Sequence, residues 1–420
     1  MKDNLISERT SSGVPVFHSR GDADLTSYRI AVKAGSRYES VDGISHVMEH
    51  MSFKGTTTRT KDEIQDTMDS YGGAFNAYTG NDWIVYQIDG QSRGSEEMLD
   101  VLTDMVCNPS LLESELVPEK EVILQEMAMR DNDPRSHFFG MIGTHIWRGS
   151  SIGHKVIGDE ESVRGIDSEV LRGFHQDMFI RENMAVFASG NVDLDMVLDK
   201  TQDTLGALPS GTRSSVPVTP FNKGDYLYEE ASGGKTCYGA ICYPTVISPD
   251  EYASFIVLAD ILADGLSSRI VKELRDRRAL IYAPSSIIYP YLGCSTFCPG
   301  FTTTGKNVRE AMGALAEVMH DVKVNGVTAK ELNNVRAKIQ VGLQSDYEGT
   351  AARLDSILGI YRRFETVQTL EERVAAYEEV TVESVQALAQ RIMDPGCMHV
   401  VLYGNEDDGM KEYSIDQLDI

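Results

Sequence analysis

Apolar residues recur along the chain at two alternating periods. Between residues 96 and 106, the positions of Met98, Leu99, Leu102 and Met105 follow the spacing of a helix with one buried face. Residues 27–32 form a short run typical of a strand. Over the first half of the chain, the pattern predicts a strand at 27–32, a helix at 43–53, a strand at 74–79 that continues through 83–88, and helices at 96–106 and 115–129.

The second half of the chain repeats this order. The pattern there predicts a strand at 238–243, a helix from about residue 251, strands at 285–291 and 295–303, and helices at 308–322 and 329–343. Strands and helices that alternate in the same order twice favour two domains of like design. We therefore predict an α+β protein with two homologous α/β-sandwich-like domains that arose by duplication.

A proline-rich stretch separates the two halves. Pro209, Pro217 and Pro220 stand among Ser, Thr and Gly residues, and this composition sustains neither a helix nor a central strand. We predict an N-terminal domain at 1–208, a linker at 209–224 and a C-terminal domain at 225–420.

Composition and charge argue against several functional classes. The chain has 39 Lys and Arg against 64 Asp and Glu, and a net charge of −25 without a basic patch repels nucleic acid. No segment approaches the ~18 consecutive apolar residues of a membrane-spanning helix. The N-terminus has neither the apolar core of a secretory signal nor the basic character of a mitochondrial presequence. The 6 cysteines lack zinc-knuckle spacing, so we expect reduced core thiols in a cytoplasmic protein.

One motif carries candidate chemistry, His46-Val47-Met48-Glu49-His50 within the predicted helix 43–53. Residues four apart lie on one face of a helix, so both imidazoles can bind one metal ion. Glu49 then lies close enough to accept a proton from a water molecule at the metal, which is the inverzincin arrangement. The structural alternative is a pair of partly exposed histidines beside a solvated glutamate.

A third ligand is expected from the predicted helix 115–129. Catalytic zinc commonly takes two histidines and one carboxylate. Glu119 and Glu126 are seven residues apart and therefore share one helix face. Spacing alone allows one of them to be the ligand and the other an outer carboxylate that orients a histidine.

The chain resembles the pitrilysin/insulinase family of zinc peptidases, specifically the smaller type related to mitochondrial processing peptidase and its bacterial homologues. The resemblance covers nearly the whole chain and rests on residues 34–39 (AGSRYE), 43–56 (GISHVMEHMSFKGT), 72–79 (GGAFNAYT) and 122–127 (VILQEM). It implies one Zn²⁺ per chain and half of a four-domain clamshell. The residue roles that it implies are metal ligands His46, His50 and Glu126, outer carboxylate Glu119 and general base Glu49.

The resemblance also implies residues that bind a peptide substrate. Asn76 and Ala77 would lie on a strand to which the substrate adds as a further strand, although the stretch alone indicates only an edge strand. Arg275 would hold a substrate carbonyl group, and Tyr282 would donate a hydrogen bond to the tetrahedral intermediate. Ala279, where the family often has glycine, puts the local geometry of this pair in doubt.

These features predict a zinc metalloendopeptidase that cleaves peptides or unfolded polypeptide segments, in peptide scavenging or precursor processing. One chain supplies two of the four domains and carries both the zinc motif and the Arg275–Tyr282 pair. We therefore expect a homodimer with sites shared between subunits, with a heterodimer with a paralogue as the alternative. The competing hypothesis is a non-catalytic or partner-dependent peptide-binding subunit, in which damage to the metal motif would be expected.

Overall fold

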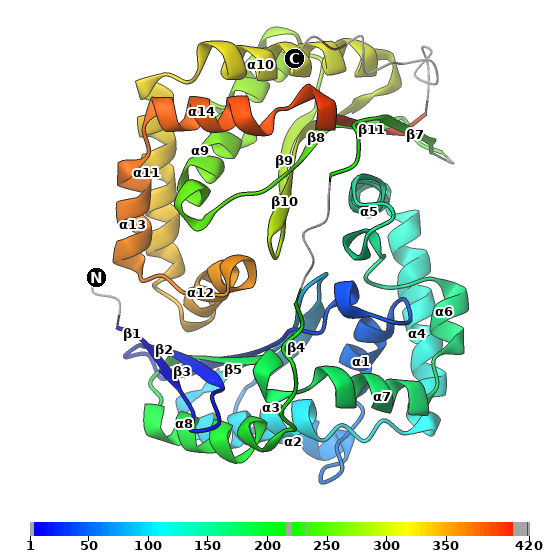
Figure 1. Ribbon diagram of the computed structural model, residues 1–420, viewed down its shortest axis with the longest axis vertical. Coiled ribbons are helices and arrows are strands. Elements are labelled where there is room, and N and C mark those ends of the chain that lie inside the picture. Colours follow the sequence, from blue (N-terminus) through cyan, green and yellow to red (C-terminus); the bar gives the residue numbers. More distant parts are fainter. Residues whose placement is uncertain (1–3, 216–220, 232, 406–417, 419–420) are drawn as a thin grey trace. The chain divides into compact units, whose positions relative to one another are not determined.

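The computed structural model describes residues 4–215, 221–231, 233–405 and 418. These residues form two compact units (Figure 1). The first unit contains the described residues of 4–129, 154–215 and 344–371. The second contains those of 130–153, 221–343, 372–405 and 418.

A mixed sheet of six strands organises the first unit. Its order is β1-β2-β6-β3-β5-β4, with β2 and β6 parallel and the other neighbours antiparallel. The strands are β1 (Leu5–Arg9), β2 (Pro15–Arg20), β3 (Leu25–Val32), β4 (Ala74–Thr79), β5 (Ile84–Gln91) and β6 (Met184–Gly190). The helices drawn wholly or mainly from this unit are α1 (Ile44–Ser52), α2 (Lys61–Ser70), α3 (Ser95–Cys107), α4 (Glu113–Asn132), α6 (Glu160–Gly165), α7 (Ser168–Met178), α8 (Leu194–Asp203) and α12 (Thr350–Phe364).

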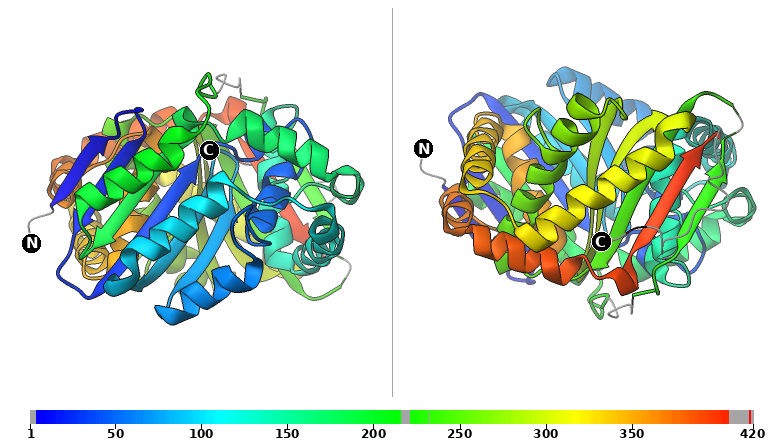
Figure 2. Two further views of the ribbon diagram at one scale, coloured as in Figure 1. Left: turned by 90° about the horizontal axis from the view of Figure 1, so that it is seen from below. Right: turned by 90° about the horizontal axis from the view of Figure 1, so that it is seen from above.

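Both faces of this sheet are covered. Alternate residues of β3 point to opposite faces. Tyr28 and Ile30 join the apolar core on the side of α3, whereas Arg29 meets Asp355 of α12 on the other side. Figure 1 shows α3 and α8 below the sheet and α12 above it, and the left view of Figure 2 shows helices that cover the lower face of the sheet.

The second unit contains a five-stranded sheet in the order β7-β11-β8-β10-β9. Its strands are β7 (Tyr226–Glu230), β8 (Thr236–Thr245), β9 (Ala283–Tyr291), β10 (Cys294–Thr304) and β11 (His399–Gly404). The helices drawn mainly from this unit are α5 (Pro134–Ile146), α9 (Tyr252–Ala263), the π-helix Val271–Arg277, α10 (Val308–Asn325), α11 (Ala329–Asp346), α13 (Leu370–Glu379) and α14 (Val382–Ile392). Short 3₁₀ helices complete the two units at Ser36–Tyr38, Ser92–Gly94, Ser151–Gly153, Arg181–Asn183, Leu205–Ala207, Pro249–Glu251, Gly305–Asn307 and Pro395–Cys397.

The two sheets repeat one topology. The order β7-β11-β8-β10-β9 matches β2-β6-β3-β5-β4 strand for strand, including one parallel pair, β7 with β11, among antiparallel ones. The predicted α+β class with two domains of like design is therefore confirmed. The elements predicted from the pattern correspond to observed elements of the same type, but the strand predicted from 74 through 88 is the antiparallel pair β4 and β5. Several observed strands and helices, including β2, β11, α5 and α12, were not predicted.

Each unit also takes a helix from the other half of the chain. The helix α5 precedes the proline-rich stretch but packs on the second sheet, where Phe138, Ile142 and Trp147 join the core of that unit. The helix α12 follows the stretch but buries Leu354, Ile357 and its neighbours in the first unit. A division at 209–224 thus separates the two sheets without separating the two units. Within that stretch, 209–215 and 221–224 contain no helix or strand, and 216–220 lie outside the described residues.

Candidate metal centre

The helix α1 carries His46, Glu49 and His50 on its inner side. His46 is 5% exposed and Glu49 is 9% exposed, so the motif is mostly buried and does not lie on a solvated surface. The helix begins after Gly43, whose φ of 84° favours glycine. A Cβ at Gly43 would also approach the carbonyl oxygen of Ile157 to 2.8 Å. Both the backbone conformation and the lack of space therefore require glycine here.

Glu39 fixes the start of α1. Its two carboxylate oxygens accept hydrogen bonds from the backbone N–H groups of Gly43 and Ser45, each at 2.9 Å. A carboxylate there satisfies donors that the helix leaves unpaired and complements the helix dipole. Burial outweighs these hydrogen bonds and raises the pKa of Glu39 to about 7.

Glu126 of α4 meets both histidines of α1. Its Oε2 atom lies 3.6 Å from Nε2 of His46 and 3.6 Å from Nε2 of His50. The two imidazole rings stand edge to face with their centroids 4.6 Å apart. The structure thus brings together the three residues that the resemblance assigns as ligands, from two different helices.

Glu119, also on α4, contacts His50 on the side of the imidazole ring that faces away from Glu126. Its Oε1 atom lies 2.8 Å from Nδ1 of His50, and its Oε2 atom forms an ion pair with Lys54. Burial alone would lower the pKa of His50, but hydrogen bonds to Glu119 and Glu126 and the charge of Glu49 raise the pKa to about 9. Burial alone would raise the pKa of Glu119, but the hydrogen bonds from His50 and Lys54 hold it below its usual value.

Glu49 receives a hydrogen bond from the edge strand β4. The Thr79 hydroxyl donates to Oε2 of Glu49 at 2.5 Å. On the same strand the Asn76 side chain is exposed and Ala77 is buried, and Asn76 Oδ1 accepts a hydrogen bond from the backbone N–H of Ala77 at 2.9 Å. Thr79 was not predicted as a site residue, although it lies within the GGAFNAYT stretch that carries the resemblance.

The donor set fits a zinc ion. The three ligand atoms lie within 4.8 Å of one another, and they are two imidazole nitrogens and one carboxylate oxygen. Ligands placed ~2.0–2.1 Å from one tetrahedral zinc ion stand roughly 3.3 Å apart, close to the 3.6 Å separations between Glu126 and the histidines. His50 already has an outer carboxylate at its second nitrogen, as zinc-bound histidines generally do.

A second group of histidines has a different character. In the second unit, Asp225 Oδ1 lies 2.7 Å from Nε2 of His145 and 2.8 Å from Nδ1 of His399. Arg148 occupies the other oxygen of Asp225 at 2.7 Å. These short contacts are hydrogen bonds that satisfy the carboxylate and tie the end of α5 to β11.

Arg275 and Tyr282 lie in the second unit, on and just after the π-helix. Arg275 forms an ion pair with Asp276 at 2.9 Å. Tyr282 donates its backbone N–H to Thr302 while its side chain stands 86% exposed. The ring of Tyr282 is therefore not part of the apolar core of this unit. Ala279 between them has a φ of 53°, which accounts for the glycine that the family often has there.

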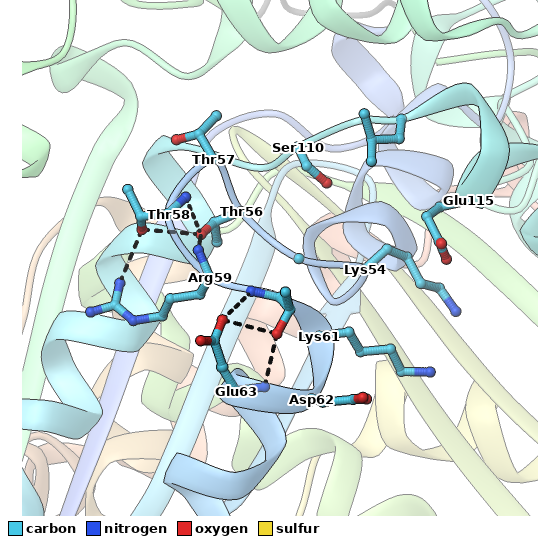
Figure 3. A pocket seen from close by; sticks show the side chains of 13 residues that line it. Lys54, Thr56, Thr57, Thr58, Arg59, Lys61, Asp62, Glu63, Ser110 and Glu115 are labelled. Carbon is cyan, nitrogen blue, oxygen red and sulfur yellow. Dashed lines mark hydrogen bonds between the residues drawn. The ribbon is translucent and has the colours of Figure 1, made fainter.

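A polar pocket of about 550 Å³ lies in the first unit (Figure 3). Its lining comprises residues 54–63 together with Ser110, Leu112 and Glu115. Figure 3 shows the side chains of Lys54 and Lys61 on the same side of this pocket. Arg59 and two threonines of the loop bind Asp104, which holds the loop in place.

Comparisons with known proteins identify the family of the chain. Residues 16–160 match the family model described as insulinase (peptidase family M16), and residues 165–339 match the peptidase M16 inactive domain. A Rickettsia bellii protein described as an uncharacterized zinc protease is 25% identical over 97% of this chain and 100% of its own length. A Bacillus subtilis protein with the same description is 26% identical over 86% of this chain and 88% of its own length.

Solved structures share the fold. A protease from Helicobacter pylori superimposes with a TM-score of 0.86 at 19% identity, covering 96% of this chain and 99% of the other. A peptidase M16 inactive domain from Pseudomonas fluorescens gives a TM-score of 0.85 at 19% identity, covering 96% and 98%. Among the described residues, no helix is long and apolar enough to cross a membrane.

Proposed function

Because the chain belongs to the insulinase (M16) family of peptidases, we propose that it is a zinc metalloendopeptidase that cleaves peptides or unfolded polypeptide segments. One observation carries this proposal, the convergence of His46, His50 and Glu126 on one point beside Glu49. All four residues lie in the segment that matches the insulinase model and not in the segment that matches the inactive domain.

In this proposal, different residues of α1 and α4 bind the metal, transfer the proton and orient a ligand. His46, His50 and Glu126 would hold one Zn²⁺ per chain, which supplies the Lewis acidity that polarises a peptide carbonyl group. Glu49 accepts the proton of the attacking water molecule and returns it to the leaving amine. The hydroxyl of Thr79 donates a hydrogen bond to one carboxylate oxygen of Glu49 and so helps to orient the general base. Glu119 keeps the Nδ1 proton of His50 and leaves Nε2 for the metal.

The edge strand β4 supports binding of an extended peptide. Among the described residues, strand β4 pairs with β5 on one side and with no strand on the other. Backbone groups on that second side can hydrogen-bond a substrate as an added strand, which accommodates many sequences. Asn76 and Ala77 lie on this strand, and Thr79 at its end touches Glu49. An extended peptide on β4 therefore runs toward the general base.

We further propose that the active form is a homodimer. Tyr282 is exposed where its phenol can reach another chain, and Arg275 lies on the same segment. Each site would take zinc and Glu49 from one subunit and Arg275 and Tyr282 from its partner. In this role Tyr282 donates a hydrogen bond to the tetrahedral intermediate. The 6 cysteines form no disulfide among the described residues, which suits a reducing compartment, and we place the protein in the cytoplasm.

The decisive test compares the parent protein with Glu49→Gln. Both are incubated with a mixture of unstructured peptides, the fragments are identified by mass spectrometry, and bound zinc is measured. We expect about one zinc per chain in both and a loss of at least ~100-fold in cleavage rate for the variant, because the general base is removed and the ligands are kept. Equal cleavage by both would contradict the role of Glu49. Zinc binding without cleavage by the parent would favour a non-catalytic or partner-dependent subunit.

A further inference from the structure

An ion pair connects the candidate metal centre to the polar pocket. The ammonium group of Lys54 contacts Oε2 of Glu119, whose Oε1 lies 2.8 Å from Nδ1 of His50. We propose that Lys54 is a positioning residue that fixes Glu119, and through it the imidazole of His50, for metal binding. This inference rests on the proposed function, since it assumes that His50 binds zinc.

The backbone places Lys54 for this task. Lys54 follows the end of α1 and donates its N–H to the carbonyl oxygen of Met51 at 3.1 Å, so it is held to the helix that carries His50. Glu119 belongs to α4, the helix that carries Glu126. The ion pair therefore joins the two helices that supply the ligands, next to those ligands.

Both partners are shielded from solvent. The side chain of Lys54 is 19% exposed and that of Glu119 is 9% exposed. An ion pair in this setting is screened less than a surface pair, and loss of one partner leaves a buried charge uncompensated. Without Lys54, nothing else among the described contacts holds Oε2 of Glu119, and the carboxylate gains freedom to rotate away from His50.

The positioning role and a role through charge alone predict opposite results. Glu49, Glu119 and Glu126 place three carboxylates around the centre, and Lys54 adds one positive charge. If Lys54 acted only through its charge, its removal would strengthen zinc binding, because a cation repels Zn²⁺. If it acts by holding Glu119, its removal weakens zinc binding, since outer-shell partners typically contribute ~10–100-fold to metal affinity.

The test measures zinc dissociation constants by competition with a chromophoric chelator. We expect Lys54→Met to bind zinc about tenfold more weakly than the parent, and Lys54→Arg, which can still pair with Glu119, to regain most of that loss. Lys61→Met is the matched control, because Lys61, the first residue of α2, lines the same pocket but forms no ion pair among the described residues. We expect it to bind zinc as the parent does.

A spectroscopic measurement separates positioning from general damage. The visible absorption bands of the Co²⁺-loaded protein report the geometry of the ligands, and we expect Lys54→Met to change them while far-ultraviolet circular dichroism stays that of the parent. Zinc binding by Lys54→Met that is equal to or tighter than the parent's, or an equal loss in Lys61→Met, would overturn the inference. A parent protein that binds no zinc would instead overturn the proposed function.

Discussion

Ala279 occupies a backbone conformation that glycine adopts at lower cost. Its φ of 53° lies in the left-handed region, and its side chain is exposed, so its methyl group contributes little packing. We expect Ala279→Gly to raise the free energy of unfolding by about 0.5–1 kcal/mol, the relief of left-handed strain less the extra freedom of glycine in the unfolded chain. Urea denaturation measures this change.

The matched control for Ala279→Gly is Ala375→Gly in α13. Ala375 is also exposed, but it lies inside a regular helix. Glycine there should lower the free energy of unfolding by about 1 kcal/mol. Destabilisation by both substitutions would show that the left-handed conformation of Ala279 carries no net strain.

Spacing predicts residues within one element better than contacts between elements. His46, Glu49 and His50 follow from the helical repeat, and the structure does place them on one side of α1. The approach of Glu126 to the histidines depends on how α4 packs against α1. The spacing therefore did not show whether Glu119 or Glu126 is the metal ligand, and only the resemblance assigned Glu126. The spacing of residues along the sequence cannot predict the contact of Thr79 with Glu49, because this contact joins a strand to a helix.

At the scale of elements, Glu39 couples α1 to pH. Its pKa is about 7 in the folded protein, above the 4.5 of an ordinary glutamate. Protonated Glu39 therefore stabilises the folded protein. Its contribution to the free energy of unfolding is full below about pH 4.5 and is lost as the pH rises through 7. A glutamine at this position does not titrate and keeps one carbonyl oxygen for the backbone of α1.

We therefore expect Glu39→Gln to gain stability relative to the parent as the pH rises from 5 to 8. Urea denaturation at several pH values measures the difference, and titrations common to both proteins cancel. Glu63→Gln is the control, because Glu63 also caps a helix, α2, but its pKa lies below the usual value. The free energy of unfolding of Glu63→Gln, relative to that of the parent, should not rise between pH 5 and 8. A Glu39→Gln difference that is constant across this range would contradict the raised pKa.

Element type was more predictable than element location. Apolar spacing identifies the buried face of a helix such as α3, where Met98, Leu102 and Met105 lie inward. It does not say which sheet that face covers, since any apolar sheet face satisfies it. The contact of Arg29 with Asp355 joins residues 326 positions apart, and only the folded chain shows it. The pattern predicted neither α5 nor α12 as a helix, and each packs in the unit of the other half of the chain, which only the folded chain shows.

At the scale of the whole molecule, the assignment of Glu49 and Tyr282 to different subunits is testable by mixing. In a mixed dimer of Glu49→Gln and Tyr282→Phe chains, one site combines both substitutions and the other site contains neither. Random exchange at equal concentrations makes about half of the dimers mixed, so about a quarter of the parent activity should return. If both residues acted within one chain, neither chain in any dimer would have a complete site.

The experiment combines the two inactive proteins, allows subunit exchange and measures peptide cleavage against each protein alone. A double variant with both substitutions, mixed with Glu49→Gln, is the control, because no pairing of those chains contains an intact Glu49. Recovery in the first mixture and none in the control would establish shared sites, since the phenol of Tyr282 then acts on a peptide held at the zinc of the other chain. No recovery, in a protein that sedimentation shows to be dimeric and exchanging, would place the full catalytic set within one chain and contradict the shared-site proposal.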